Sequence, residues 1–531
     1  MAISFPAIRA ARGGTGVPPL LALLAAAIAA GILLPVVYLI IRASENGALF
    51  DTLTQQSSLS TLLRTCFLAG AVTGAAIAIS LPAAWLTVRT DLPFRRLWAV
   101  LLSLPLVFPS YVGAFAFVSA LGPRGMLQDL LEPSGVDNLP AIYGFRGAWI
   151  VLTLFTFPYV LIPLRAAMAG IDRSTEEAAR SLGVSPWMAF FRITVPQLRP
   201  AIAAGGLLVA LYALSDFGAV SILRFDSLTR VIFIQYKSAF DRSEAASLAL
   251  LLVAVALVVV WLEAMTRGRA RYHAASVSQA PAQVKLGRWK GPALAFCGTI
   301  AFFSLFVPAF VLLYWLGRGI DEGQSVSFAW SAAWNSIKVA GLGALAAVAA
   351  AMPIALLSVR YPGLIGRTFE KVAYSGAGLP GISIALALVF FAANYTPIIY
   401  QTLVLLIFAY VVRFLPQALG ACRTSLLQTN PKTEEAARGL GAGRLTVFSR
   451  ITLPQLLPGM SAGGLLVFLT VIKELPATLL LSPIGFDTLA TKIWANTNEA
   501  LFAQAAVPAI LLVLISAVPA TIMVLREQRL R

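Results

Sequence analysis

Long apolar runs recur along the whole of this 531-residue sequence, and they constrain its fold more than any other feature. Clear examples are residues 17–41, 245–262 and 505–525. Each run is close to the about 20 residues that an α-helix needs to cross the hydrocarbon core of a bilayer. With 59% hydrophobic and only 12% charged residues, the chain also lacks the charged surface of a soluble protein. The sequence therefore predicts an all-α polytopic membrane protein that lies in the lipid bilayer.

The basic residues indicate which loops lie in the cytoplasm. The formal net charge of +17 could suggest nucleic acid as a partner. However, Lys and Arg gather in short clusters between the apolar runs, which is the positive-inside pattern, so we expect no nucleic-acid partner. Counting helices so that every basic cluster is cytoplasmic places both termini there and predicts about twelve transmembrane helices. They are expected at 17–41, 59–88, 98–121, 147–166, 200–219, 245–265, 293–316, 334–358, 372–393, 399–421, 458–475 and 505–525.

The second half of the chain repeats the first. Residues 175–200 match residues 433–458 at a constant offset of 258, with 16 of 26 positions identical. Most of the identical residues are polar, Gly or Pro, so shared hydrophobicity does not explain the match. Further upstream an offset of 271 pairs Pro82 with Pro353 and Arg89 with Arg360. Both copies follow an even-numbered helix, which predicts a parallel repeat around a central path.

The repeat and the composition together predict the domain organisation. Residues 266–292 are polar, basic and rich in Ala, Ser and Gln, as expected of a linker between two six-helix halves. The expected segments are an N-terminal helix with an outer loop at 1–58, a first transmembrane domain at 59–265, the cytoplasmic linker at 266–292, the first helix of the second half with an outer loop at 293–329, a second transmembrane domain at 330–525 and a cytoplasmic tail at 526–531.

The duplicated loop predicts two short helices separated by a glycine. In the first copy Ser174 and Glu177 have the spacing of a capping box, and in the second copy Asn430 and Pro431 form an alternative helix start. Gly183 and Gly441 should end the first short helix in a left-handed conformation. A second short helix should then run until Pro196 in one copy and Pro454 in the other.

The spacing E-A-A-x3-G-x9-I-x-[LV]-P resembles the cytoplasmic loop of binding-protein-dependent ATP-binding-cassette (ABC) importer permeases of the type I fold. It occurs complete in both copies, with Val195 in place of Leu before Pro196 as the one departure. The resemblance covers most of residues 59–264 and 330–525 and implies that the loop docks on an ATP-hydrolysing subunit. The docking residues implied by the motif are Glu177, Ala178, Ala179 and Gly183, with Glu435, Ala436, Ala437 and Gly441.

The same resemblance implies the partners and the location of the protein. Two similar loops imply two copies of a separate ATPase subunit, and the family also uses a periplasmic substrate-binding protein. No G-K dipeptide occurs in this chain, so it has no P-loop, and ATP and Mg would bind the partner rather than a cofactor site here. We therefore expect a non-enzymatic subunit in the bacterial inner membrane.

Three stretches, residues 104–125, 212–236 and 473–494, look like those of ferric iron permeases. Thiamine permeases share the fused two-half plan and are the alternative. Neither the chelation state of the substrate nor a substrate site of the permease itself follows from the resemblance. Three cysteines without C-x-x-C spacing and a single histidine, His273, give no recognisable metal site.

Asp216 and Glu474 occupy the same place in the repeat, late in the expected fifth helix of each half. An acidic side chain at membrane depth is costly and commonly functional, and carboxylate oxygen suits a hard cation. The two residues are therefore candidates for an acidic pair that faces the substrate path. The alternatives are an interhelical salt bridge or a position at the outer interface facing water.

A secondary transporter is the competing class, because twelve helices in two halves also suit ion-coupled carriers. That class predicts charged residues within several helices and no duplicated cytoplasmic loop. Here the charges lie almost entirely between the apolar runs and the loop occurs twice, which favours the ABC importer permease.

Overall fold

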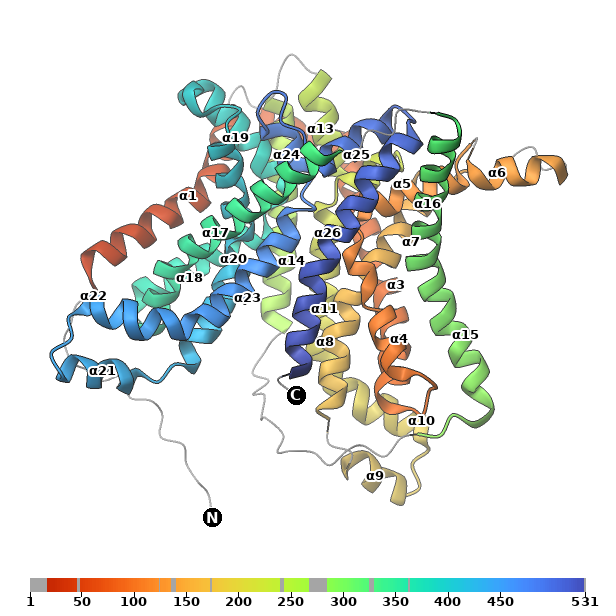
Figure 1. Ribbon diagram of the computed structural model, residues 1–531, viewed down its shortest axis with the longest axis horizontal. Coiled ribbons are helices and arrows are strands. Elements are labelled where there is room, and N and C mark those ends of the chain that lie inside the picture. The colour runs from red at the N-terminus through yellow and green to blue at the C-terminus, as the bar shows by residue number, and fades with distance from the viewer. Residues whose placement is uncertain are drawn as a thin grey trace.

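The computed structural model describes residues 17–44, 48–123, 125–134, 140–171, 174–238, 243–266, 284–323, 329–361 and 363–529 (Figure 1). Within these ranges the regular elements are helices, apart from one isolated β-bridge between Thr90 and Val284. The first part of the chain forms α1 (Pro19–Ser44), α2 (Ala48–Thr54), α3 (Gln56–Arg89), α4 (Arg95–Leu101), α5 (Ser110–Leu121), α6 (Met126–Leu131), α7 (Phe145–Thr156), α8 (Pro158–Ala169), α9 (Ser174–Ser181), α10 (Pro186–Ala189), α11 (Val195–Ser215), α12 (Gly218–Ile222), α13 (Leu228–Ser238) and α14 (Ser243–Thr266).

The second part repeats this order of helices. It forms α15 (Lys290–Ala301), α16 (Val307–Asp321), α17 (Trp330–Arg360), α18 (Leu364–Ser375), α19 (Gly381–Tyr395), α20 (Leu403–Gln428), α21 (Pro431–Gly439), α22 (Arg444–Val447), α23 (Leu453–Val471), α24 (Pro476–Leu481), α25 (Leu489–Asn498) and α26 (Phe502–Arg529). Among the described residues, ten helical stretches are long and apolar enough to cross a membrane, or twelve if each of two bent pairs is one span. The predicted all-α polytopic architecture of about twelve spans is confirmed.

The third predicted helix of each half is wrong as a straight span. Residues 98–121 fold into α4 and α5 with a 93° bend between the two helical stretches, and residues 372–393 lie in α18 and α19 with a 105° bend. The cause is Pro109 in the first half and Pro380 in the second, which directly precede α5 and α19. A proline cannot continue the hydrogen-bond ladder of a preceding helix, and it holds the residue before it in an extended conformation.

The inner parts of these bent pairs form the centre of the molecule. Residues 110–120 of α5 are all buried, as are residues 381–390 of α19. A helix that is apolar on every side is buried either inside a protein or in lipid, and these two lie inside the protein. One hydrophobic core, which includes residues of both halves, therefore encloses the two helices.

The first helix of each half packs against the other half. Helix α1 contacts α17, α18 and α19, whereas α16 contacts α5 and α26. In Figure 1, α1 accordingly lies beside the helices of the second half and α15 and α16 lie beside α3, α4 and α5. The exchange interlocks the two halves, so neither forms a separate globular unit.

The end of the expected linker is attached to the first half. Residues 267–283, including His273, lie outside the described residues, but Val284 pairs with Arg89 and Asp91 through backbone hydrogen bonds. The Asp91 carboxylate accepts a hydrogen bond from the Leu286 amide (2.8 Å) and lies 2.9 Å from Lys290 Nζ. These two contacts, the Leu286 amide first, hold the pKa of Asp91 below its usual value. The start of α15 is thereby fixed beside the end of α3.

Candidate functional site

The two duplicated loops lie at the same end of the molecule, the lower end in Figure 1, which is also where α26 ends. The first loop contains α9 and α10, and the second contains α21 and α22. Gly183 has φ +88° and Gly441 has φ +85°, so the predicted left-handed turn is confirmed at both positions. A Cβ atom at either glycine would meet no atom within 4 Å, and the requirement for glycine is therefore conformational rather than steric.

The two predicted helix starts have different outcomes. Asn430 caps α21 through a hydrogen bond from the Lys432 amide (3.1 Å), and Pro431 follows as the first helical residue, as predicted. The side chains of Ser174 and Glu177, which would form the capping box of the first copy, lie outside the described residues.

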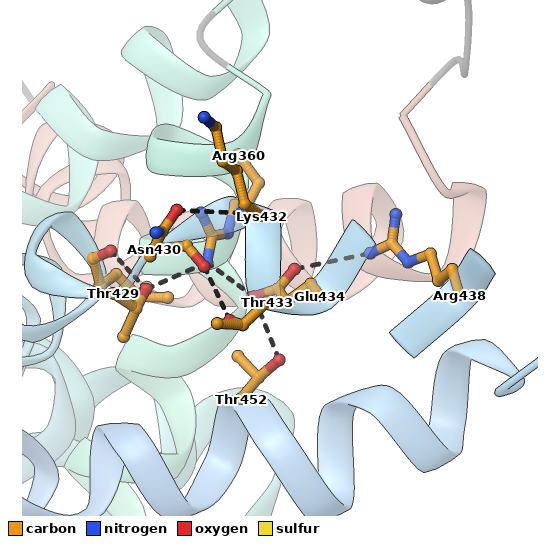
Figure 2. Close-up of polar contacts among 9 residues, drawn as sticks. Arg360, Thr429, Asn430, Lys432, Thr433, Glu434, Arg438 and Thr452 are labelled. Carbon is orange, nitrogen blue, oxygen red and sulfur yellow. Dashed lines mark hydrogen bonds and ion pairs between the residues drawn. The ribbon is translucent and has the colours of Figure 1, made fainter. Parts of the chain in front are cut away.

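The first glutamate of each loop points inward and attaches the loop to the helix that follows. Thr194 Oγ1 donates to Glu176 Oε2 at 3.1 Å, and at the equivalent place Thr452 Oγ1 donates to Glu434 Oε1, also at 3.1 Å. In the second loop Arg360 Nη2 adds an ion pair to Glu434 Oε1 at 2.6 Å (Figure 2). A carboxylate that accepts from a hydroxyl and a guanidinium is bound more strongly than one that accepts from neutral donors alone. Glu176, Glu434 and their partners were not among the predicted site residues, although their identity in both copies was visible in the sequence.

The residues expected to dock on the partner point away from the protein. In the second loop Glu435, Ala436 and Gly441 are exposed and Ala437 is half-buried; in the first, Ala178 and Gly183 are exposed and Ala179 is half-buried. The backbone of Glu177 belongs to α9, and its side chain is not among those described.

Sequence reasoning missed two leucines of the same surface. Leu182 is 85% exposed and Leu440 is 90% exposed, at equivalent positions directly before Gly183 and Gly441. A single exposed leucine is ordinary, but two at matched positions on matched loops form a repeated apolar contact point. A pocket of about 390 Å³ lies beside the first of them, lined by Gly183, Met188, Arg192 and Ile193 among others.

The prediction that Pro196 and Pro454 end the second short helix is wrong. Each proline lies in the first turn of the long helix α11 or α23, and the chain reaches that helix through a π-helical turn of five residues. The turns comprise residues 190–194 and 448–452, and a third, residues 302–306, precedes Pro308 in the same way. The wider π turn gives the proline ring room against the preceding carbonyl groups, so the helix continues instead of breaking.

Asp216 directly follows α11, and Glu474 lies three residues after the end of α23, near the place where the halves meet. A Cβ atom at Gly218 of the first half would lie 3.1 Å from Leu475 Cδ2 of the second, and Lys473 Nζ donates to the Leu106 carbonyl of the first half at 2.7 Å. We call this region, around residues 106–111, 212–218, 381, 413 and 473–475, the seam.

Asp216 is buried and is bonded by uncharged groups. Its Oδ1 accepts from the amides of Ala219 (3.0 Å) and Val220 (3.3 Å) and so caps α12. Its Oδ2 accepts from Ser110 Oγ, which in turn accepts from the Tyr212 hydroxyl at 3.1 Å. Within the described part of the chain, no Lys or Arg lies within ion-pair distance of Asp216.

Glu474 has an ionic partner instead. Arg413 Nη1 of α20 lies 2.8 Å from Glu474 Oε1, with only 6% of the Glu474 side chain exposed. The Ala477 amide also donates to Oε1 at 3.3 Å, so Glu474 caps α24 as Asp216 caps α12. Of the sequence alternatives, the interhelical salt bridge is therefore present at Glu474. Arg413 was missed, although a charged residue inside the run 399–421 was the available signal.

Among the described residues no three His, Cys, Asp or Glu side chains gather in a way that could hold a metal ion. The seam therefore offers two separate carboxylates rather than a compact metal centre. What it provides chemically is a buried polar region between two apolar halves, near the ends of the helices that follow the duplicated loops.

Comparison with known proteins agrees with the duplicated architecture. The profile of the family described as "Binding-protein-dependent transport system inner membrane component" matches twice, over residues 76–322 and 341–531. The molybdenum transport system permease protein ModB of Escherichia coli is 31% identical over 213 residues, which is 38% of this chain and 92% of ModB. ModB is thus matched over nearly its whole length by less than half of this chain.

Other relatives extend over both halves. The Fe(3+)-transport system permease protein FbpB 2 of Haemophilus influenzae is 34% identical over 493 residues, which is 92% of this chain and 94% of that protein. The ferric transport system permease protein FbpB of Actinobacillus pleuropneumoniae is 26% identical over 75% of this chain and 60% of its own length. With two profile matches on a twofold-repeated helical fold, the chain belongs to the family of binding-protein-dependent transport system inner membrane components, as a multi-pass permease with two fused halves.

Proposed function

We propose that this chain is the permease subunit of an ABC importer that carries ferric iron across the bacterial inner membrane. The observation that supports the substrate most strongly is the 34% identity to a Fe(3+)-transport permease over nearly the full length of both chains. In this proposal a periplasmic binding protein delivers iron to the end of the molecule opposite the duplicated loops. The loops, both termini and the residue 266–292 linker then lie in the cytoplasm.

The duplicated loops are the proposed docking points for two copies of a separate ATPase subunit. The contact surface of each loop comprises the second Glu, the two Ala residues and the turn Gly, together with the exposed Leu182 or Leu440. Two equal surfaces suit two equal partners, so one permease chain would bind an ATPase homodimer. ATP and Mg would bind those subunits, and this chain would supply no cofactor site.

The helices that follow the loops supply a route for coupling. Glu176 is bonded to Thr194 in the π turn that leads into α11, and the 21 residues of α11 end beside Asp216. A helix of that length spans about 32 Å, which is the thickness of the hydrocarbon core. In the second half the bond from Thr452 to Glu434 leads through α23 to Glu474 in the same way. Movement of the ATPase subunits would thereby displace Asp216 and Glu474 at the seam.

The test of this proposal is reconstitution of the permease with its ATPase and binding protein in proteoliposomes. ATP hydrolysis and iron uptake should be stimulated by ferric-loaded binding protein and not by thiamine-loaded binding protein. Native mass spectrometry of the detergent-purified complex should give two ATPase subunits per permease chain. Stimulation by thiamine-loaded binding protein would identify thiamine rather than iron as the substrate. A single ATPase subunit per chain would contradict the proposed docking. Uptake driven by an ion gradient without ATP would indicate the secondary-transporter class.

A further inference from the structure

At the seam, the first half adds hydroxyl groups to the Asp216 carboxylate at which the proposed coupling route ends. Asp216 at the end of α11 is bonded by Ser110, which begins α5, and Tyr212, one turn before Asp216, is bonded to Ser110. Tyr111 follows Ser110 on α5 and is 3% exposed. Tyr111 lies against Gly218, two residues after Asp216, where a Cβ atom would be 2.7 Å from Tyr111 Cβ. Two helices thus bring one carboxylate and three hydroxyls to one place.

Packing of the Tyr111 ring does not explain why its hydroxyl group is buried at this place. Its hydroxyl is buried and has no hydrogen-bond partner among the described residues. Buried hydroxyl groups are nearly always hydrogen-bonded, because an unpaired one has lost its water without replacement. The hydroxyl therefore lies where a passing ligand would satisfy it.

The second half does not repeat this set. By the offsets of the repeat, Gly381 stands for Ser110, Ile382 for Tyr111 and Thr470 for Tyr212. Thr470 is turned to a different partner, since its hydroxyl donates to Gln417 Oε1 at 3.0 Å. Glu474, the counterpart of Asp216, is already paired with Arg413. The oxygen set is therefore confined to one side of the seam.

The cations of the seam are engaged elsewhere. The Arg413 guanidinium is bonded to Glu474. Lys473 Nζ donates to the Leu106 carbonyl. Asp216 is thus a buried carboxylate whose direct partners among the described residues are hydroxyl and amide groups.

We propose that Ser110, Tyr111, Tyr212 and Asp216 form a transit site that a hard cation, ferric iron in the proposed function, contacts on its way between the halves. Oxygen ligands are the type that hard cations prefer. Only Asp216 can carry a full charge, and the three hydroxyls contact the passing ion through its bound water as neutral hydrogen-bonding groups, so no proton has to leave. Such a site binds weakly enough to release its ion, which conduction through a path requires.

The experiment uses the reconstituted complex with ferric-loaded binding protein and compares Tyr111→Phe, Tyr212→Phe and Asp216→Asn with the wild type. Uptake of radiolabelled iron, ATP hydrolysis and thermal unfolding are measured on the same preparations. Thr470→Val, the position equivalent to Tyr212, is the matched control in the other half. Tyr38→Phe is a second control, since this buried tyrosine also has a bonded hydroxyl, 3.2 Å from Asn394 Nδ2, but lies away from the seam.

Iron uptake per ATP hydrolysed should fall about tenfold in Tyr111→Phe and Tyr212→Phe, equivalent to a barrier higher by about 1.4 kcal/mol. Both controls should stay near wild type. Thermal stability should not fall in Tyr111→Phe, because the lost hydroxyl had no partner in the folded protein. Normal uptake in both tyrosine variants, or losses that merely follow lowered stability, would overturn the site and leave the iron importer intact. A wild-type complex that ferric-loaded binding protein does not stimulate would overturn the proposed function itself, and the site with it.

Discussion

The duplicated loops and the seam are each built twice, but the two copies have stayed alike only in the loops. The loop copies share 16 of 26 residues, the same left-handed glycine and a Thr–Glu hydrogen bond of the same length. At the seam, Ser110 stands opposite Gly381 in the repeat and Phe155 opposite Arg413. The same backbone plan therefore supports two different sets of side chains.

At the seam, Phe155 of the first half and Arg413 of the second half occupy corresponding places. In the first half the Phe155 ring lies against α5 at Gly113, where a Cβ atom would be 2.1 Å from Cε2. In the second half Arg413 takes the place of Phe155 and lies against α19 at Gly381, where a Cβ atom would be 1.6 Å from Nη1. An aromatic contact on one side thus corresponds to a buried ion pair on the other. If the two loops bind identical partners, both must keep the same side chains. Two sides of a path that face one substrate can instead carry different side chains.

The largest effect is expected from giving Gly381 a side chain, which tests whether the second half depends on the Arg413 position. In Gly381→Ala the new methyl group displaces the end of Arg413, which is flexible, but this separates it from Glu474. Breaking a buried ion pair lowers the free energy of unfolding by about 3–5 kcal/mol. Because Arg413 and Glu474 can partly pair again, we expect a loss of about 3 kcal/mol. Thermal unfolding of the purified permease measures it.

The control for this prediction is the same substitution in the background Arg413→Met with Glu474→Gln. That background replaces the ion pair by uncharged side chains of similar size, so Gly381→Ala should then cost much less. Equal losses in both backgrounds would show that the glycine is required by backbone packing, and the comparison between the two walls would fail.

The next effect tests whether the two loops are equivalent. Gly183→Val and Gly441→Val force a β-branched residue into the left-handed region, which costs about 1–2 kcal/mol at each site. Since nothing lies near either Cβ position, the cost is conformational and should be equal in the two loops. We expect transport to fall in both variants while membrane insertion persists.

Gly439→Val is the matched control, because this exposed glycine ends α21 without a positive φ and also has open space around it. It should transport normally apart from a small loss of helix propensity. Normal transport in one loop variant and failure in the other would show that the two loops have different roles despite their shared sequence.

The sequence predicts the loops well because their determinants are local. The turn conformation at Gly183 and Gly441 and the Asn430 cap depend on residues a few positions apart. The bends before α5 and α19 were also encoded locally, by Pro109 and Pro380, but the apolar runs on both sides hid them. Hydropathy reports whether a segment can lie in lipid and does not report its direction.

The seam could be predicted only in part, because its partners are distant in the sequence. Asp216 and Glu474 were found by their place in the repeat, yet their surroundings come from Ser110, 106 positions away, and from Arg413, 61 positions away. Equal positions in a repeat therefore did not mean equal environments. The π turns before Pro196 and Pro454 were missed for a similar reason, since a proline predicts a helix end unless the turn before it widens.

A smaller effect is expected from separating the loops from the helices that follow them. Thr194→Val and Thr452→Val keep the shape of the side chain and remove the hydroxyl that donates to Glu176 or Glu434. Each should cost about 1 kcal/mol for one lost hydrogen bond to a partly exposed carboxylate. Stimulated ATP hydrolysis should persist while iron uptake per ATP falls, because the loop still docks but moves its helix less effectively.

Substitution to Ser is the control, since Thr194→Ser and Thr452→Ser keep the donor and should restore coupling. In the second loop Arg360 still holds Glu434 after the threonine is changed, so Thr452→Val should have no larger an effect than Thr194→Val. A larger effect in the second loop would mean that the ion pair does not fix Glu434, and would distinguish two loops that share most of their sequence.

The smallest effect concerns a contact that joins the two halves near the linker, the attachment of Val284 and Leu286 beside Asp91. The pKa of Asp91 is held below its usual value, so the carboxylate stabilises the attachment above the unfolded-state pKa of about 4 and loses this effect as the pH falls through the lowered value. Hydrogen exchange of the Leu286 amide, corrected for its intrinsic rate, should therefore become less protected in acid. The Val284 amide, which donates to the Arg89 carbonyl, is the internal reference. Asp91→Asn should make the protection of Leu286 independent of pH over this range. If wild type and variant show the same pH profile, the backbone pairing alone holds the linker, and the asymmetry between the halves is limited to the seam.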